Sequence, residues 1–247
     1  MRIPVSFFIV SCSLLPLSSF AQVSTKDSSI RAMAVYNAVQ QYQRTVTVES
    51  PLYNGQEYIE YESQLHTGHP FFEERDFHPA SIMYDNILYE NIPFKYDLIK
   101  KKLVIRSPVG GFSINILDNK VSSFEVQGHQ FVRLTKDSSG RKALTTGFYD
   151  LLYNGRKTQL LKKESKKILE ELTIMDGIKR TVTDDAAYYL QKGGTYSTIN
   201  SKKQALELLK DRKTELKQYI RKNKLKFRAN KENDLVKLVT YYDTTWN

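Results

Sequence analysis

The 247-residue sequence is poor in the residues that define several special classes of protein. It has one cysteine, Cys12, one tryptophan, 7 prolines and 11 glycines. A single cysteine rules out a disulfide scaffold, and so little proline and glycine rules out a collagen-like or low-complexity chain. No apolar run reaches the ~18–20 residues that cross a bilayer as a helix. No Rossmann fingerprint, phosphate-binding loop, EF-hand loop or Gly-x-Ser-x-Gly elbow is present, so no cofactor is predicted.

The residues that are abundant indicate an ordinary folded chain. Hydrophobic residues make up 40% and charged residues 26%, and 37 Lys and Arg against 27 Asp and Glu give a net charge of +10. The 16 tyrosines and 12 phenylalanines favour strands and half-exposed surfaces, where the ring packs and the hydroxyl reaches water. We expect one β domain with a helical addition, and a soluble protein once any leader is removed.

Residues 1–21 have the pattern of a secretory signal peptide. Arg2 precedes an apolar stretch over residues 3–17, and Ser19-Phe20-Ala21 supplies the small residues of a cleavage site before Gln22. Export is therefore expected, with a mature chain that has no cysteine for disulfides, thiol catalysis or zinc–thiolate binding. The alternative is an outer-membrane lipoprotein lipidated at Cys12, but that cysteine comes too early in the leader.

Hydrophobic periodicity predicts an α+β fold. A helix over 29–44 leads into an extended segment over 45–49, and at least eight short strands with tight turns follow between residues 57 and 165. The tight turns include Asp85-Asn86 and Asn154-Gly155, where Asn-Gly is typical of a type I′ hairpin. Such strands need antiparallel neighbours, so we expect a meander that curls into a roll or partly open barrel, forming a domain over 22–165.

The remaining region, 166–247, is predicted to be a hairpin followed by three short helices, packed on the same core. No element is assigned to the basic stretch 162–180. The hairpin pairs 187–191 with 195–199. The helices are expected over about 202–209, 212–222 and 230–242, each with one apolar stripe.

Several segments together resemble exported proteins of unknown function that are common in Bacteroidota. They are Tyr53-Asn-Gly-Gln-Glu-Tyr58, Gly68-His-Pro-Phe-Phe72, Tyr84…Tyr89…Tyr96-Asp97, Gly147-Phe-Tyr-Asp150, Tyr188-Tyr189, Ser201-Lys-Lys, Leu216-Lys-Gln-Tyr219 and Leu235-Val-Lys-Leu-Val-Thr-Tyr-Tyr242. The resemblance implies location in the Gram-negative envelope, most simply the periplasm, and a non-catalytic role. It carries over no catalytic residues.

Two histidine-containing segments could carry chemistry. His66, His69 and His78, with Glu73, Glu74 and Asp76 between them, form the densest group of metal ligands and would suit zinc. The alternative is a surface connector, because the spacing is not that of a helical zinc motif. His129 has no partner in sequence, although Asp118, Asp137 and Asp150 lie on neighbouring segments. We expect it to be a polar strand end.

The helices carry a basic stripe. Lys213, Lys217, Arg221 and Lys224 follow steps of three or four residues and should line one side of the second helix. Such a stripe could contact anionic lipid or acidic glycan at a membrane surface, whereas nucleic acid is not expected as a partner of an exported chain. The alternative is a solvated helix face.

The sequence therefore predicts a non-enzymatic binding or interaction protein of the envelope. Its partner would be an envelope protein or an apolar, lipid-like or anionic ligand, held by residues that the sequence does not identify. The curled, Tyr-rich sheet is one expected site for such a ligand. The alternative function is a metal-dependent hydrolase that uses the His66, His69 and His78 segment.

Overall fold

The computed structural model describes residues 30–35, 37–38, 50–136, 144–173 and 177–245. The expected leader over 1–21, its Cys12 and the extended segment over 45–49 lie outside the described residues. Residues 30–35, 37 and 38 are helical, which agrees with the predicted helix over 29–44 as far as it is described. The chain divides into two compact units, 1–45 and 46–247, and the second contains every element discussed below.

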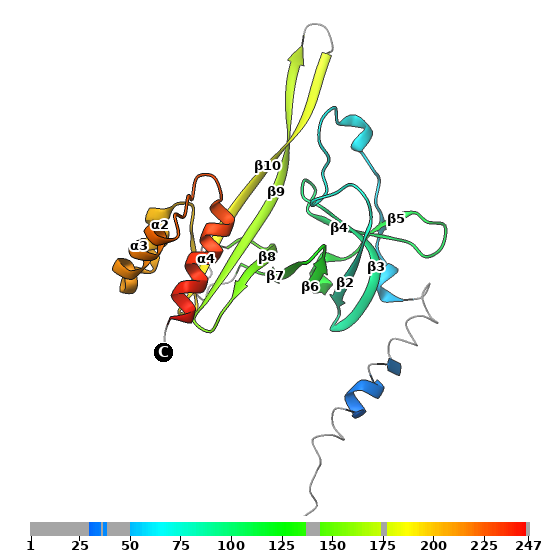
Figure 1. The fold of residues 1–247 in the computed structure, drawn as a ribbon. Helices are drawn as coiled ribbons and strands as arrows, with labels where there is room; N and C mark the ends of the chain where they lie inside the picture. Colours follow the sequence, from blue (N-terminus) through cyan, green and yellow to red (C-terminus); the bar gives the residue numbers. More distant parts are fainter. Residues whose placement is uncertain (1–29, 36, 39–49, 137–143, 174–176, 246–247) are drawn as a thin grey trace, which may run out of the picture. The chain divides into compact units, whose positions relative to one another are not determined.

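The second unit is built on one open antiparallel sheet of 11 strands, in the order β1-β5-β4-β3-β2-β6-β7-β8-β9-β10-β11 (Figure 1). The strands are β1 Gln56–Glu57, β2 His78–Tyr84, β3 Ile87–Asp97, β4 Lys102–Arg106, β5 Ser113–Asn115, β6 Val121–Val126, β7 His129–Leu134, β8 Gly147–Asn154, β9 Thr158–Thr173, β10 Gly177–Lys192 and β11 Thr195–Thr198. Short 3-10 turns occur at Pro51–Tyr53, Glu62–Gln64, Asp118–Lys120 and Lys210–Arg212. The predicted α+β fold with an open sheet is confirmed.

The strand order departs from a simple meander at two places, because β1 does not pair with β2 and β5 does not pair with β6. β5 pairs with β4 and β1, so the chain leaves it through the 3-10 turn Asp118–Lys120 and returns as β6 on the far side of β2. There Ile82 of β2 lies opposite Phe124 of β6. β2 is thereby paired on both edges and stands in the middle of the sheet.

Tight turns explain most of the hairpins. Asp85-Asn86 has φ values of 48° and 64°, and Gly193-Gly194 has 56° and 78°. Left-handed conformation at both central residues defines the type I′ turn, whose twist suits a hairpin. The predicted hairpins at these two places are confirmed.

The hairpin at Asn154-Gly155 has a different turn. Neither residue has a positive φ. The turn spans residues 155–157, and Gly155 N–H donates to Thr158 O at 2.9 Å. The predicted type I′ turn is therefore wrong. The turn docks on a helix instead: Lys157 N–H donates to Asp243 Oδ1 at 3.0 Å, and a Cβ at Gly155 would overlap that carboxylate.

One face of strands β2–β8 is covered by its own aromatic rings. Phe94 and Phe124 have ring centroids 4.9 Å apart, and Phe124 stacks on Phe131 at 4.7 Å. Tyr96 and Phe148 pack edge-on against the same group and are buried. This side of the sheet, which the Tyr-rich sequence suggested as a ligand surface, is packed as a hydrophobic core.

The predicted helices are confirmed as α2 Lys202–Leu208, α3 Lys213–Lys222 and α4 Lys231–Thr244. Ser201 caps α2, because its hydroxyl accepts from Gln204 N–H at 3.2 Å. The helices pack on the sheet through a second core that contains Leu160, Leu190, Leu206, Leu216, Ile220, Leu235, Leu238, Val239 and Tyr242. None of the described helices is long and apolar enough to cross a membrane.

The stretch without a sequence assignment forms the longest hairpin among the residues that the structure describes. β9 and β10 each have 16 residues and pair along their whole length. Thr158 lies opposite Lys192 at one end, and Thr173 lies opposite Gly177 at the other. The expected domain boundary at 165/166 falls inside β9. β8 pairs only with the start of β9 and β11 only with the end of β10, so the far half of the hairpin extends beyond the neighbouring strands (Figure 1). We call residues 167–173 and 177–183 the arm.

Candidate functional site

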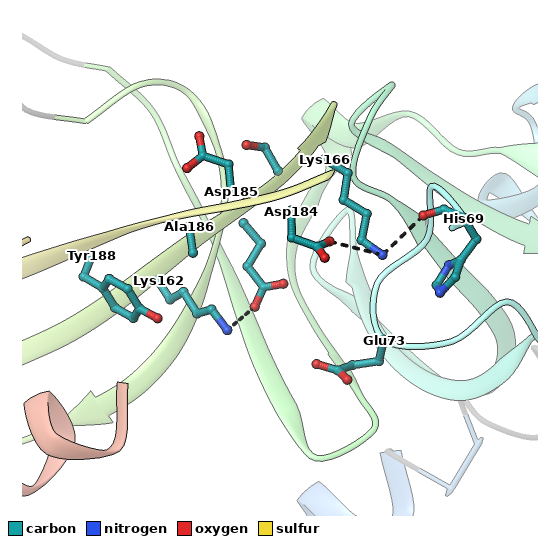
Figure 2. A pocket seen from close by; sticks show the side chains of 10 residues that line it. His69, Glu73, Lys162, Lys166, Asp184, Asp185, Ala186 and Tyr188 are labelled. Carbon is teal, nitrogen blue, oxygen red and sulfur yellow. Dashed lines mark hydrogen bonds and ion pairs between the residues drawn. The ribbon is translucent and has the colours of Figure 1, made fainter. Parts of the chain in front are cut away.

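A charged cavity of about 430 Å³ lies beside the middle of the β9–β10 hairpin (Figure 2). Alternate residues of a strand share a face, so Lys162, Glu164 and Lys166 of β9 line it. Their cross-strand partners on β10 complete that wall, and the loop before β2 lies opposite. The remaining lining residues are Tyr188, Ala186, Asp184, Asp185, Ser165, His69 and Glu73.

The lysines of this cavity are already neutralised by the protein. Lys162 Nζ lies 2.7 Å from Glu232 Oε2 of α4 and also pairs with Glu164. Burial alone would lower the pKa of Lys162, but the hydrogen bonds to these carboxylates outweigh it and hold the pKa above its ordinary value. Burial raises the pKa of Glu164, and Lys162 opposes that rise. Burial and Glu232 raise the pKa of Tyr188 to about 12.

Lys166 makes a similar internal connection. Its Nζ donates to Phe71 O at 2.7 Å and to His69 O at 3.3 Å, and it lies 3.6 Å from Asp184 Oδ1 (Figure 2). The two lysines therefore tie the loop before β2 and helix α4 to the central hairpin. The arrangement is suited to holding the fold together, because the ammonium group of each lysine already contacts oxygen atoms of the protein.

The three histidines of the metal hypothesis have separate surroundings. His66 Nδ1 accepts from Arg180 N–H at 3.1 Å, and His78 Nε2 lies 2.9 Å from Glu74 Oε2. His69 lines the charged cavity, where burial and then the positive charges of Lys166 and Arg75 lower its pKa. Within the residues that the structure describes, no three His, Cys, Asp or Glu side chains come together as a metal site.

His129 does have a partner, which its position in the sequence could not identify. Its Nδ1 lies 2.7 Å from Asp150 Oδ2, because the pairing of β7 with β8 puts Phe131 opposite Asp150. Asp150 is buried, which raises its pKa, and His129 opposes the rise. The imidazole packs edge-on against Phe72, with centroids 5.1 Å apart. Of the other acids considered, Asp118 lies in the 3-10 turn before β6, and Asp137 lies outside the described residues.

A second site, which we call the basic groove, lies at the helical end. It consists of two adjoining hollows of about 570 and 620 Å³ that share Lys202, Leu225 and Lys226. Its apolar residues come from α2, α3 and the segment before α4: Leu206, Ile220, Leu225 and Phe227. Its six cations are Lys202, Lys217, Arg221, Lys224, Lys226 and Arg228.

The cations of the basic groove differ from the other lysines and arginines nearby. Lys192 lies 2.6 Å from Asp211, Lys213 lies 3.1 Å from Glu207, and Arg212 pairs with Glu215. In the part of the chain that the structure describes, none of the six groove cations has such an acidic partner, and no acidic residue lines the groove. Uncompensated cations around an apolar floor create a positive potential where an anion with an apolar part can bind.

Of the predicted basic stripe, Lys217 and Arg221 lie on α3, whereas Lys224 lies beyond its end. Lys217, Arg221 and Lys224 line the groove, whereas Lys213 turns to Glu207. Sequence reasoning missed the apolar floor supplied by the segment between α3 and α4. The sequence feature that indicates this floor is Lys224-Leu-Lys-Phe-Arg228, in which basic and apolar residues alternate.

Comparison with known proteins adds no functional assignment. No family model, no curated protein and no solved structure matches this chain. The function must be argued from the two sites themselves.

Proposed function

We propose that this protein is a non-enzymatic binding protein of the cell envelope that holds an anionic amphiphile in the basic groove. The observation that carries the proposal is the set of six cations without acidic partners around Leu206, Ile220, Leu225 and Phe227. The fitting chemistry is an anionic headgroup, such as a phosphate or carboxylate, attached to an acyl chain. The metal-dependent hydrolase gains no comparable support, because the three histidines contact different groups.

Location in the envelope rests on the sequence. The leader over residues 1–21 and the resemblance to exported proteins of Bacteroidota support export to the periplasm, with Gln22 as the mature N-terminus. A periplasmic protein meets the anionic headgroups of both membranes. A basic groove on a periplasmic protein would therefore meet anionic headgroups at both membranes.

The size of the groove and its charge set the expected strength of binding. Hollows of about 570 and 620 Å³ lie within the usual range for small-molecule sites, roughly 300–1,000 Å³. Each lysine or arginine near an anionic membrane surface contributes about 1 kcal/mol. Because these side chains are exposed, added salt should weaken the charge contribution strongly, while the contribution of the apolar floor should remain.

The first test is co-sedimentation of the purified protein with vesicles of phosphatidylcholine, with or without phosphatidylglycerol. The wild type should sediment only with the anionic vesicles and only at low salt. The variant Lys217→Glu/Arg221→Glu/Lys224→Glu should stay in the supernatant. A matched control, Lys203→Glu/Lys222→Glu/Lys237→Glu, changes the net charge equally at exposed lysines outside the groove and should still sediment.

The second test separates a membrane surface from a free amphiphile. Titration with a short-chain lysophosphatidylglycerol below its micelle concentration should show saturable binding that Phe227→Ser weakens. Inorganic phosphate, which lacks the chain, should bind more weakly and should not respond to Phe227→Ser. Equal loss of binding in the groove variant and in its matched control would mean that total charge, not this groove, is responsible.

A further inference from the structure

The arm has apolar side chains that stay exposed among the residues that the structure describes. Leu172 is 85% exposed and Leu169 50%, and Ile178, which lies opposite Leu172 on β10, is 48% exposed. At the base of the arm the β10 edge is covered, because Val182 N–H donates to Thr67 O at 2.9 Å. The exposed apolar residues therefore lie on a hairpin whose β10 edge is covered at its base.

The β9 edge of the arm has unpaired backbone groups. Lys166 N–H donates to Leu98 O at 3.3 Å, so Lys166 points its backbone groups away from β10. Alternate residues of an antiparallel strand point the same way, so Ile168 and Glu170 also direct N–H and C=O to this edge. Among the described residues these backbone groups, which point away from β10, have no hydrogen-bond partner. An exposed edge of this kind is a template for another strand.

We infer that the arm pairs with the arm of a second copy of this chain, edge to edge and antiparallel, about a two-fold axis at Leu169. The side-chain pattern of β9 carries the inference. Lys167, Leu169 and Glu171 share one face, and all three are exposed. Antiparallel pairing centred on Leu169 places Leu169 against its own counterpart and Lys167 against Glu171 of the second copy, on both sides of the axis.

The backbone geometry agrees with this register. With Leu169 on the axis, Ile168 and Glu170 of one copy lie opposite Glu170 and Ile168 of the other, and these are the residues that point to the free edge. Leu169 then occupies a non-hydrogen-bonded position, where opposed side chains approach most closely. Pairing ends at Lys167 and Glu171, because the Lys166 N–H is already bonded to Leu98.

The pattern also distinguishes pairing from simple protection of an edge. Lysines alone would repel a second copy and are a common device against edge-to-edge association. Here the opposite charges at Lys167 and Glu171 are placed so that the strand complements itself. The interface is small, so we expect a weak, salt-sensitive dimer.

The test is sedimentation equilibrium of the purified protein over a range of concentrations at low and high salt. The wild type should form a dimer that dissociates as salt rises. Lys167→Glu alone and Glu171→Lys alone should each weaken the dimer roughly tenfold or more, because opposite charges become like charges across the axis. Lys222→Glu, on α3, should have no effect.

Complementation separates pairing from damage to the fold. An equimolar mixture of the Lys167→Glu and Glu171→Lys proteins restores opposite charges at both contacts, so a heterodimer should form, and the double variant should again dimerise with itself. Leu169→Lys, which places two cations on the axis, should not be rescued by either. A wild type that stays monomeric at every concentration, or a dimer that the single reversals leave unchanged, would overturn the inference.

Discussion

Replacing Lys162 by methionine should destabilise the protein strongly, although it removes only one charge, in a cavity that opens to the surface. Lys162 is 14% exposed, and it is the cation that Glu164 and Glu232 share. Methionine keeps the length of the side chain and removes the charge. Two carboxylates, one of them 16% exposed, would then face each other without a cation.

The size of the effect follows from the burial of the partners. Removing one member of a buried ion pair costs about 3–5 kcal/mol, because the other charge stays desolvated. Glu232 is 33% exposed and can turn to water, which favours the lower end, about 3 kcal/mol. In a domain of roughly 150–250 residues, 1 kcal/mol corresponds to about 2–4 °C. The melting temperature should therefore fall by roughly 6–12 °C.

The pH dependence of this loss has a definite sign. Burial already raises the pKa of Glu164 in the wild type, and removal of Lys162 takes away the group that opposes the rise. A carboxyl whose folded-state pKa is raised binds its proton more readily in the folded state, so lowering the pH through that pKa stabilises the fold. The difference between wild type and Lys162→Met should shrink as the pH falls from about 7 toward 5.

Urea unfolding and thermal melting, followed by circular dichroism, measure both effects. Lys203→Met, at an exposed lysine of α2, is the control and should change the free energy of unfolding by no more than about 0.5 kcal/mol. Adding Glu164→Gln to Lys162→Met should recover part of the loss, because a neutral amide is less costly to bury. A Lys162→Met protein as stable as the wild type at pH near 7 would show that the carboxylates rehydrate freely and that the ion pairs do not hold α4 to the sheet.

Two further outcomes are expected. Gly155→Ala should lower the free energy of unfolding by about 1–3 kcal/mol, because its Cβ would overlap the Asp243 carboxylate, and urea denaturation should show partial recovery in Gly155→Ala/Asp243→Ala. If Gly155→Ala has no effect, the hairpin does not dock on α4 as described. Intact-mass analysis of the native protein should give an N-terminus at Gln22, and a lipid adduct on Cys12 would contradict that processing.

Local sequence signals predicted the hairpins where the turn alone determines the backbone. Asp85-Asn86 has the left-handed conformation that its own residue types favour, and the contacts of Asp85 with Lys120 support the same turn, so the sequence was sufficient. At Asn154-Gly155 the contact with Asp243, far along the chain, decides the shape of the turn. A glycine can be required by space as well as by φ, and only the folded structure distinguishes the two reasons.

The β9–β10 hairpin escaped prediction for a related reason. Beyond Lys162 the strands are not covered on either face by a continuous core, so hydrophobic residues no longer alternate with polar ones. The basic residues of the groove could be predicted in part from the sequence, but its apolar floor could not. Helical spacing placed Lys217 and Arg221 on one side of α3, but the pairing of Lys213 with Glu207 and the apolar floor at Phe227 depend on how separate segments meet.

The return of the chain from β5 to β6 divides the sheet into two parts that are joined by strands distant in the sequence. β2 meets β6 through pairs such as Ile82 with Phe124, and β1 meets β5 through Gln56 with Asn115, so both pairings must close long loops before any contact stabilises them. From β2 to β5, and again from β6 to β11, each strand pairs with the next along the chain, which gives two local meanders. Contacts near in sequence form fastest. Both meanders can therefore form early, and the pairing of β2 with β6, which joins them, forms later.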